Sequence, residues 1–170
     1  MTSDIKRKIV KITYCIYLIL LICFIFGNSM SSIDESAEQS TAILDAVNNL
    51  VESVGLPFKF EHIFIRKTAH IIEFVTLGAS LFGFLVLNKK VKSENCVYCA
   101  FFCCLVAMTD ETIQFFCERG SMVVDVWLDF VSAVVGISIS YLIYYFICKK
   151  TDRFSNSMEQ SECVIPSSAS

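Results

Sequence analysis

The stretch VWLDFVSAVVGISISYLIYYFIC, from Val126 to Cys148, decides the fold. A helix that crosses a bilayer needs about 20 mostly apolar residues, and this stretch meets that length. Three more apolar stretches cover residues 9–26, 69–87 and 96–116. Of the 170 residues, 55% are hydrophobic and only 18% are charged. The sequence therefore predicts an all-α, polytopic membrane protein with four transmembrane helices. A net charge of -3 argues against a nucleic-acid partner.

Basic residues mark one side of the predicted membrane. Because cytoplasmic loops carry an excess of Lys and Arg, we predict a multi-pass membrane protein with both termini on the cytoplasmic side. Residues 1–8 are then the cytoplasmic N-terminus, 9–148 the membrane domain and 149–170 a disordered, Ser-rich cytoplasmic tail. The first span also resembles a signal peptide. We interpret it as a retained anchor because no clear A-x-A-like site follows. The basic residues are Lys6, Arg7, Lys8, Lys11, Lys89, Lys90, Lys92, Lys149, Lys150 and Arg153.

The first outer loop contains an amphipathic pattern over residues 40–54. Its apolar residues recur at helical spacing and its polar residues take the other face. The pattern predicts a helix that lies on the membrane surface or caps the bundle. The apolar face consists of Ile43, Leu44, Val47, Leu50, Val51 and Val54.

Ionisable residues gather where the second span begins, the third ends and the fourth begins. Consecutive spans alternate in direction, so these three places share the outer side of the membrane. Charges at bilayer depth are costly, face the bundle interior and are functional by default. We therefore expect a polar pocket that opens outward, above a closely packed inner half. The three helical faces are Arg66, His70 and Glu73; Cys99, Cys103, Ala107, Asp110 and Gln114; and Asp125, Asp129, Ser132, Gly136 and Ser140.

These residues suit several kinds of chemistry. The candidate catalytic residues are His70, Glu73 and Asp110, which suit proton transfer or a divalent metal ion. No motif identifies a cofactor. The alternative to a functional site is a salt-bridge network that only holds the helices together. Basic side chains in the set suit the phosphate or carboxylate of an anionic lipid head group or of a peptide terminus. The candidate ligand-binding residues are Arg66, Lys67, Glu111, Gln114, Arg119, Asp125 and Asp129.

The same motifs resemble the VanZ-like membrane protein family. The resemblance lies in FIRKTAHIIEF (Phe64–Phe74), in TDETIQFF (Thr109–Phe116) and in Arg119, Asp125 and Gly136. It implies a bacterial cell-envelope protein of the cytoplasmic membrane, in a family linked to resistance to the glycopeptide teicoplanin. This chain departs from the family pattern with Phe for Tyr, Cys-Glu for Pro-Gly and Asp for Asn, at Phe74, Cys117–Glu118 and Asp129.

Three functional hypotheses follow. The first is an envelope-modifying factor or lipid-handling enzyme that binds or modifies an anionic outer-leaflet ligand. The second is a non-catalytic scaffold, in which the charges only lock the helices and a partner protein or a second copy docks. The third is a small transporter, disfavoured because no acidic residue continues toward the cytoplasm. Substitution of Asp110 separates the first two, since the scaffold predicts loss of folded protein rather than loss of activity per molecule.

Overall fold

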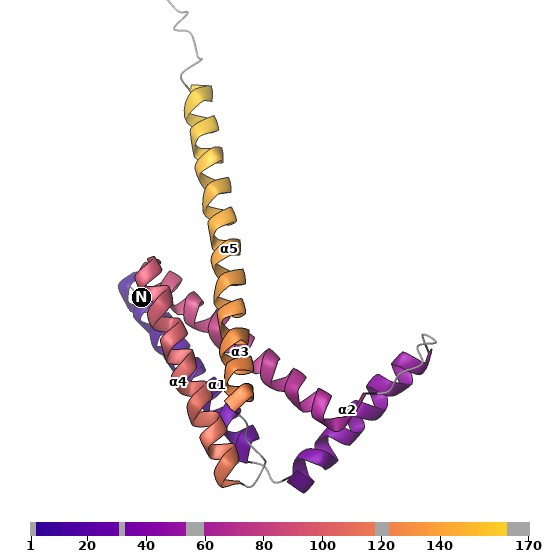
Figure 1. Cartoon of the computed structure of the whole chain (residues 1–170). Helices are drawn as coiled ribbons and strands as arrows, with labels where there is room; N and C mark the ends of the chain where they lie inside the picture. The colour runs from indigo at the N-terminus through magenta and orange to yellow at the C-terminus, as the bar shows by residue number, and fades with distance from the viewer. Residues whose placement is uncertain (1–2, 31–32, 54–59, 118–122, 163–170) are drawn as a thin grey trace, which may run out of the picture.

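The computed structural model describes residues 3–30, 33–53, 60–117 and 123–162, and α-helix is the regular secondary structure that these residues form. Four helices are long and apolar enough to cross a membrane, over Asp4–Met30, His62–Leu87, Ser93–Phe116 and Val123–Thr151. The all-α fold with four spans is thus confirmed. The helices are α1 (Ser3–Met30), α2 (Ile33–Ser53), α3 (His62–Leu87), α4 (Ser93–Phe116) and α5 (Val123–Glu162) (Figure 1).

Each spanning helix begins earlier than the apolar stretch that predicted it. α3 begins at His62 rather than at residue 69, after Glu61 in an extended conformation. Its added turns carry Arg66 and Lys67, which are too polar to count toward a hydropathy window but suit a helix at the membrane interface. The polar residues at the start of α3 therefore belong to the helix and share its geometry.

A tight turn joins α3 to α4 and sets the alignment of the bundle. Lys89 adopts a left-handed conformation with φ 54°, and the Lys90 N–H donates to the Leu85 carbonyl at 2.9 Å. This 6→1 bond closes the end of α3 and satisfies one of its last carbonyls. The short connection makes α4 an antiparallel neighbour of α3. The start of α3 and the end of α4 therefore lie at the same end of the bundle.

The closest helix packing joins α3 to α5. A Cβ atom at Gly136 would clash with the backbone of Val75, and one at Gly78 would clash with the backbone of Ala133. Small residues allow membrane helices to approach this closely. The sequence placed Gly136 on a packed face, as the structure confirms, but it did not specify α3 as the partner. The buried core around this contact includes Ile25, Phe74, Leu77, Phe82, Cys103, Val106, Ala107 and Ile137.

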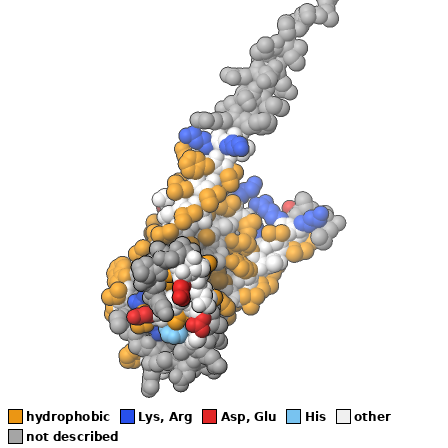
Figure 2. Space-filling view, turned by 90° about the vertical axis from the view of Figure 1, so that its right-hand side faces the viewer, with side chains coloured by type: hydrophobic (Ala, Val, Ile, Leu, Met, Phe, Trp, Pro, Cys, Tyr) orange, Lys and Arg blue, Asp and Glu red, His pale blue; other side chains and the backbone are white. Residues whose placement is uncertain are grey.

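Large apolar side chains cover the outside of the bundle. Ile19 and Leu20 of α1, Phe101 of α4 and Phe146 of α5 are all well exposed in the isolated chain. In Figure 2 hydrophobic side chains cover the middle of the molecule, most basic side chains lie toward the upper end, and most acidic side chains, with a His, lie at the lower end. An apolar band with polar ends is the surface expected of a protein immersed in a bilayer.

The amphipathic helix of the first loop is present as α2 and starts at Ile33, before the predicted residue 40. It lies outside the bundle, beside the first part of α3 (Figure 1). Leu44 on its apolar face is buried. Asn48 fixes the connection, since its amide oxygen accepts from the Phe60 N–H at 2.8 Å and its amide nitrogen donates to the Phe60 carbonyl. Val54, the last residue of the predicted face, lies outside the described residues.

The C-terminal segment differs from the prediction of a disordered tail from residue 149. α5 continues to Glu162, beyond the ends of the other helices (Figure 1). Residues 149–162 contain no Gly or Pro. A helix that is already formed can therefore propagate through them, since adding a residue to a helix is much easier than starting one. Residues 163–170 lie outside the described part of the chain.

Candidate functional site

Polar side chains from four helices meet at one end of the bundle. The end of α1, the start of α3, the end of α4 and the start of α5 all reach this region. We call the group the polar cluster. Among the described residues, it consists of Asn28, Ser29, Arg66, Lys67, His70, Glu73, Asp110, Glu111, Gln114, Asp125 and Asp129.

Asp110 is the fully buried centre of the polar cluster. Its side chain has no exposed surface, and both of its oxygens accept hydrogen bonds. Ser29 Oγ donates to Oδ1 at 2.6 Å, and Gln114 Nε2 donates to Oδ2 at 2.9 Å from one turn further along α4. Hydrogen bonds of this kind offset the cost of burying a carboxylate. Asp110 is therefore held in one orientation by α1 and by its own helix.

The contribution of α1 is the part of the site that the sequence analysis missed. Asn28 Nδ2 donates to Glu73 Oε1 at 2.6 Å, and Ser29 supports Asp110 as described. Both residues directly follow the first apolar stretch. Neutral polar residues at the end of a span usually mark the membrane interface, so they carried no functional signal. Only their predicted membrane depth, which matches that of Glu73 and Asp110, could have indicated that they belong to the site.

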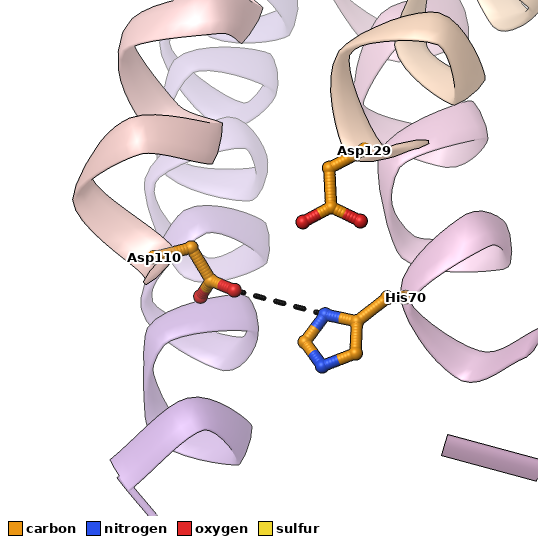
Figure 3. Close-up of side chains that lie close together, drawn as sticks. All are labelled: His70, Asp110 and Asp129. Carbon is orange, nitrogen blue, oxygen red and sulfur yellow. Dashed lines mark ion pairs between the residues drawn. The ribbon is translucent and has the colours of Figure 1, made fainter. Parts of the chain in front are cut away.

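His70 of α3 lies between carboxylates from three helices. Its Nδ1 is 3.7 Å from Asp110 Oδ2 and 3.8 Å from Glu73 Oε2. Figure 3 shows the Asp129 carboxylate of α5 turned toward the gap between His70 and Asp110. Donor atoms of these three residues, one each, lie within 4.8 Å of one another. The candidate catalytic residues His70, Glu73 and Asp110 are therefore brought together, and Asp129 joins them.

A small polar pocket adjoins this centre. Lys67 Nζ donates to Asp125 Oδ1 at 2.6 Å, which ties α3 to α5 at the rim. Arg66, His70, Glu111, Gln114 and Asp129 also line the pocket, together with Lys67, Asp125 and Leu128. All but one of the predicted ligand-binding residues thus lie around one pocket. The exception is Arg119, which lies outside the described residues.

A larger groove of about 680 Å³ lies between α4 and α5. Apart from Glu111 and Thr112, the side chains that line it are apolar: Cys104, Met108, Phe115, Phe116, Val123, Val126, Trp127 and Phe130. Glu111 also lines the polar pocket. One buried carboxylate therefore separates an apolar groove from a polar site, which is the arrangement that an amphiphilic ligand needs.

A family model described as VanZ/LLP1 matches residues 14–146. The chain belongs to the VanZ/LLP1 family. The match includes all four spanning helices in large part and every residue of the polar cluster, so the resemblance read from the sequence motifs is confirmed. No curated protein and no solved structure is significantly similar to the chain.

Proposed function

We propose that this VanZ/LLP1 protein binds an anionic amphiphile of the bacterial cell envelope, either a lipid or a lipid-linked peptidoglycan precursor. The head group binds at the mouth of the polar pocket, whose interior of about 10 Å³ holds no more than about one water molecule, and the chain occupies the groove between α4 and α5. The observation that carries the proposal is Glu111, which lines both spaces. Pockets that bind amphiphiles combine an apolar wall with a few convergent polar groups, as this pair does.

Two cations at the rim supply the preference for an anionic head group. Arg66 and Lys67 both line the polar pocket, and the Lys67 side chain is 38% exposed even while it contacts Asp125. Lys and Arg near a membrane surface attract anionic lipids and hold phosphate or carboxylate groups. Most basic residues lie at the opposite end of the bundle, which we assign to the cytoplasm. We therefore infer that the polar cluster lies in the outer leaflet.

The buried centre suits proton transfer on the bound head group. A general base must lie within hydrogen-bond reach of the proton that it takes, directly or through one water. His70 faces the pocket, and Asp110 and Glu73 lie beside it on the bundle side. In an enzyme of this kind, His70 would exchange the proton while Asp110 orients the ring and Glu73 supports the charged form.

The sole Trp of the chain, Trp127, provides a direct test because it lines the groove. The protein is reconstituted in vesicles that contain a small mole fraction of lipid brominated on the acyl chain, with either an anionic or a zwitterionic head group. We expect the anionic lipid to quench Trp127 fluorescence more than its mole fraction predicts, and the zwitterionic lipid to follow its mole fraction. Lys67→Gln should reduce the difference between them.

A matched control moves the fluorophore away from the groove. In Trp127→Phe with Ile72→Trp, the new Trp replaces an exposed side chain on α3, close to His70 in sequence. This variant should show quenching that follows mole fraction for both lipids. Equal quenching of native Trp127 by the two brominated lipids would contradict the proposal.

The family's link to teicoplanin gives a cellular form of the same proposal. In a sensitive Gram-positive host, the parent protein should raise the teicoplanin concentration needed to stop growth. Asp110→Asn should remove this effect at an equal membrane level of protein, because it removes a charge from the centre of the cluster. No effect from a well-expressed parent would separate this chain from the resistance phenotype.

A scaffold is the second candidate, and the helix-to-helix hydrogen bonds favour it. Asn28–Glu73, Ser29–Asp110 and Lys67–Asp125 each join two different helices, so the polar cluster also locks the bundle. In a scaffold the charge at Asp110 has no role beyond packing. Asp110→Asn would then change the cellular effect only in proportion to its membrane level.

A further inference from the structure

The polar cluster holds more negative than positive charge. Among the described residues, it contains the carboxyl groups of Glu73, Asp110, Glu111, Asp125 and Asp129, whereas Arg66 and Lys67 are its permanent cations. Lys67 is committed to Asp125 at the rim. The carboxyl groups around His70 therefore lie in a region of low dielectric with little nearby positive charge. An uncompensated buried charge is expensive, so a compensating positive group is expected there.

Three side chains form a geometry that suits a metal ion. His70, Asp110 and Asp129 come from α3, α4 and α5, and they offer one nitrogen and two oxygen donors within 4.8 Å of one another. Two ligands on opposite sides of a divalent ion are separated by about 4–5 Å, since each bond is about 2.0–2.6 Å long. The observed spacing is within reach of one shared ion after small side-chain shifts.

Asp129 provides an independent indication of a ligand. Its side chain is 2% exposed, and its Oδ2 is buried without a hydrogen-bond partner among the described residues. Figure 3 shows this carboxylate directed at His70 and Asp110 rather than away from them. Buried carboxylate oxygens normally have partners, so an unpartnered one requires a specific explanation. A bound cation supplies such a partner.

We propose that His70, Asp110 and Asp129 bind a divalent first-row transition-metal ion. The imidazole nitrogen favours such an ion over Mg²⁺ or Ca²⁺, whose sites are built from oxygen ligands. The hydrogen bonds from Ser29 and Gln114 to Asp110 fix the orientation of one ligand, as outer-shell partners do in metal sites. An open coordination position would face the polar pocket.

The ion would give the pocket a positive centre at its base. Its role in holding an anionic head group rests on the proposed function, whereas metal binding itself does not and can be measured without any added lipid ligand. Failure of metal binding would leave the lipid-quenching result untouched. Failure of lipid binding would likewise leave a metal site in place.

The test uses Mn²⁺ alone, because Mn²⁺ prefers oxygen and nitrogen donors and avoids confusion with thiol sites in a chain with nine Cys. The full chain is purified in detergent, treated with a chelator and titrated with Mn²⁺ while the signal of the free ion is followed by electron paramagnetic resonance. We expect one Mn²⁺ per chain. Asp129→Asn should weaken binding at least about tenfold, in line with the loss of a charged ligand.

Asp125→Asn is the matched control. It removes a carboxylate one turn away on the same helix, in the same cluster but outside the group of three. It removes a nearby charge and releases Lys67 but removes no ligand, so it should weaken Mn²⁺ binding clearly less than Asp129→Asn does. Equal losses in Asp125→Asn and Asp129→Asn would show nonspecific attraction to the acidic cluster and would overturn the proposal.

Thermal unfolding gives a second readout that does not depend on the titration. Mn²⁺ should raise the unfolding temperature of the parent but not that of Asp129→Asn or His70→Asn, because a ligand stabilises only the state that binds it. If the parent neither binds Mn²⁺ nor gains stability, the proposal is wrong.

Discussion

Ser29 shows how a single hydroxyl group can matter in the membrane. It is fully buried and donates to Asp110 across the α1–α4 boundary. Ser29→Ala would leave Asp110 Oδ1 without this donor, and an unsatisfied buried polar group costs about 1–3 kcal/mol. We expect the free energy of unfolding in detergent to fall by that amount, as measured by denaturant titration.

Ser138→Ala is the comparison for this residue-scale prediction. Ser138 is exposed and donates only to the Val134 carbonyl of its own helix. Its loss should change the free energy of unfolding by no more than about 0.5 kcal/mol. Equal effects of the two substitutions would mean that Ser29 does not support Asp110.

The sequence predicted members of the polar cluster mainly where their side chains are charged. The spacing of Arg66, His70 and Glu73 and the alternation of spans were enough to bring His70 near Asp110. The ion pair at the rim was not predictable, because the spacing gave no reason to prefer Lys67 over Arg66 as the partner of Asp125. The structure selects Lys67. Neutral donors such as Ser29 gave no electrostatic signal at all.

At the scale of helices, the contact between α3 and α5 is the most sensitive part of the bundle. Gly136→Ala places a methyl group against the backbone of Val75, and overpacking of this kind typically costs about 1–3 kcal/mol. We expect a lower unfolding temperature in detergent. Separation of α3 from α5 should also lengthen the distance from Lys67 to Asp125 at the rim.

Gly27→Ala is a control of identical chemistry. A Cβ atom at Gly27 would meet nothing within 4 Å, and Ala is the better helix former. This variant should be as stable as the parent or slightly more stable. If Gly27→Ala lost as much stability as Gly136→Ala, the loss would come from replacing Gly in a helix and not from the close contact between α3 and α5.

Periodicity predicts which face of a helix is buried but not which helix covers it. The small residues of α5 were correctly placed on a packed face, yet they pack against Gly78 and Ala79 of α3, which periodicity alone did not identify as their partners. The end of α5 was also not predictable from hydropathy, since a helix continues until a residue stops it. Hydropathy shows where the chain leaves the bilayer, whereas a helix ends where a residue interrupts its backbone hydrogen bonds. These two positions can differ.

At the scale of the whole molecule, the arrangement of the helices gives a topology that can be measured. His62 begins α3 at the end that holds the polar cluster, and Lys90 lies in the turn at the opposite end; both side chains are exposed. In a background without native Cys, we expect His62→Cys to react with a membrane-impermeant thiol reagent on intact cells. Lys90→Cys should react only after the cells are opened.

The opposite labelling pattern would place the polar cluster on the cytoplasmic side and contradict the assignment made from basic residues. Both variants keep the length of every span. Their difference in labelling therefore reports sidedness alone, provided that the two proteins reach the membrane in equal amounts.

The hydrogen bonds from α1 also have a consequence for how the chain is made. Synthesis proceeds from the N-terminus, and Ser29 precedes Asp110 by 81 residues, as Asn28 precedes Glu73 by 45. Each donor therefore leaves the ribosome before its carboxylate does. α5 is synthesised last, so Asp125 and Asp129 follow the polar residues of α1, α3 and α4. The order of synthesis therefore supplies a hydrogen-bond donor for Asp110 and for Glu73 before either carboxylate has to be buried in the bilayer.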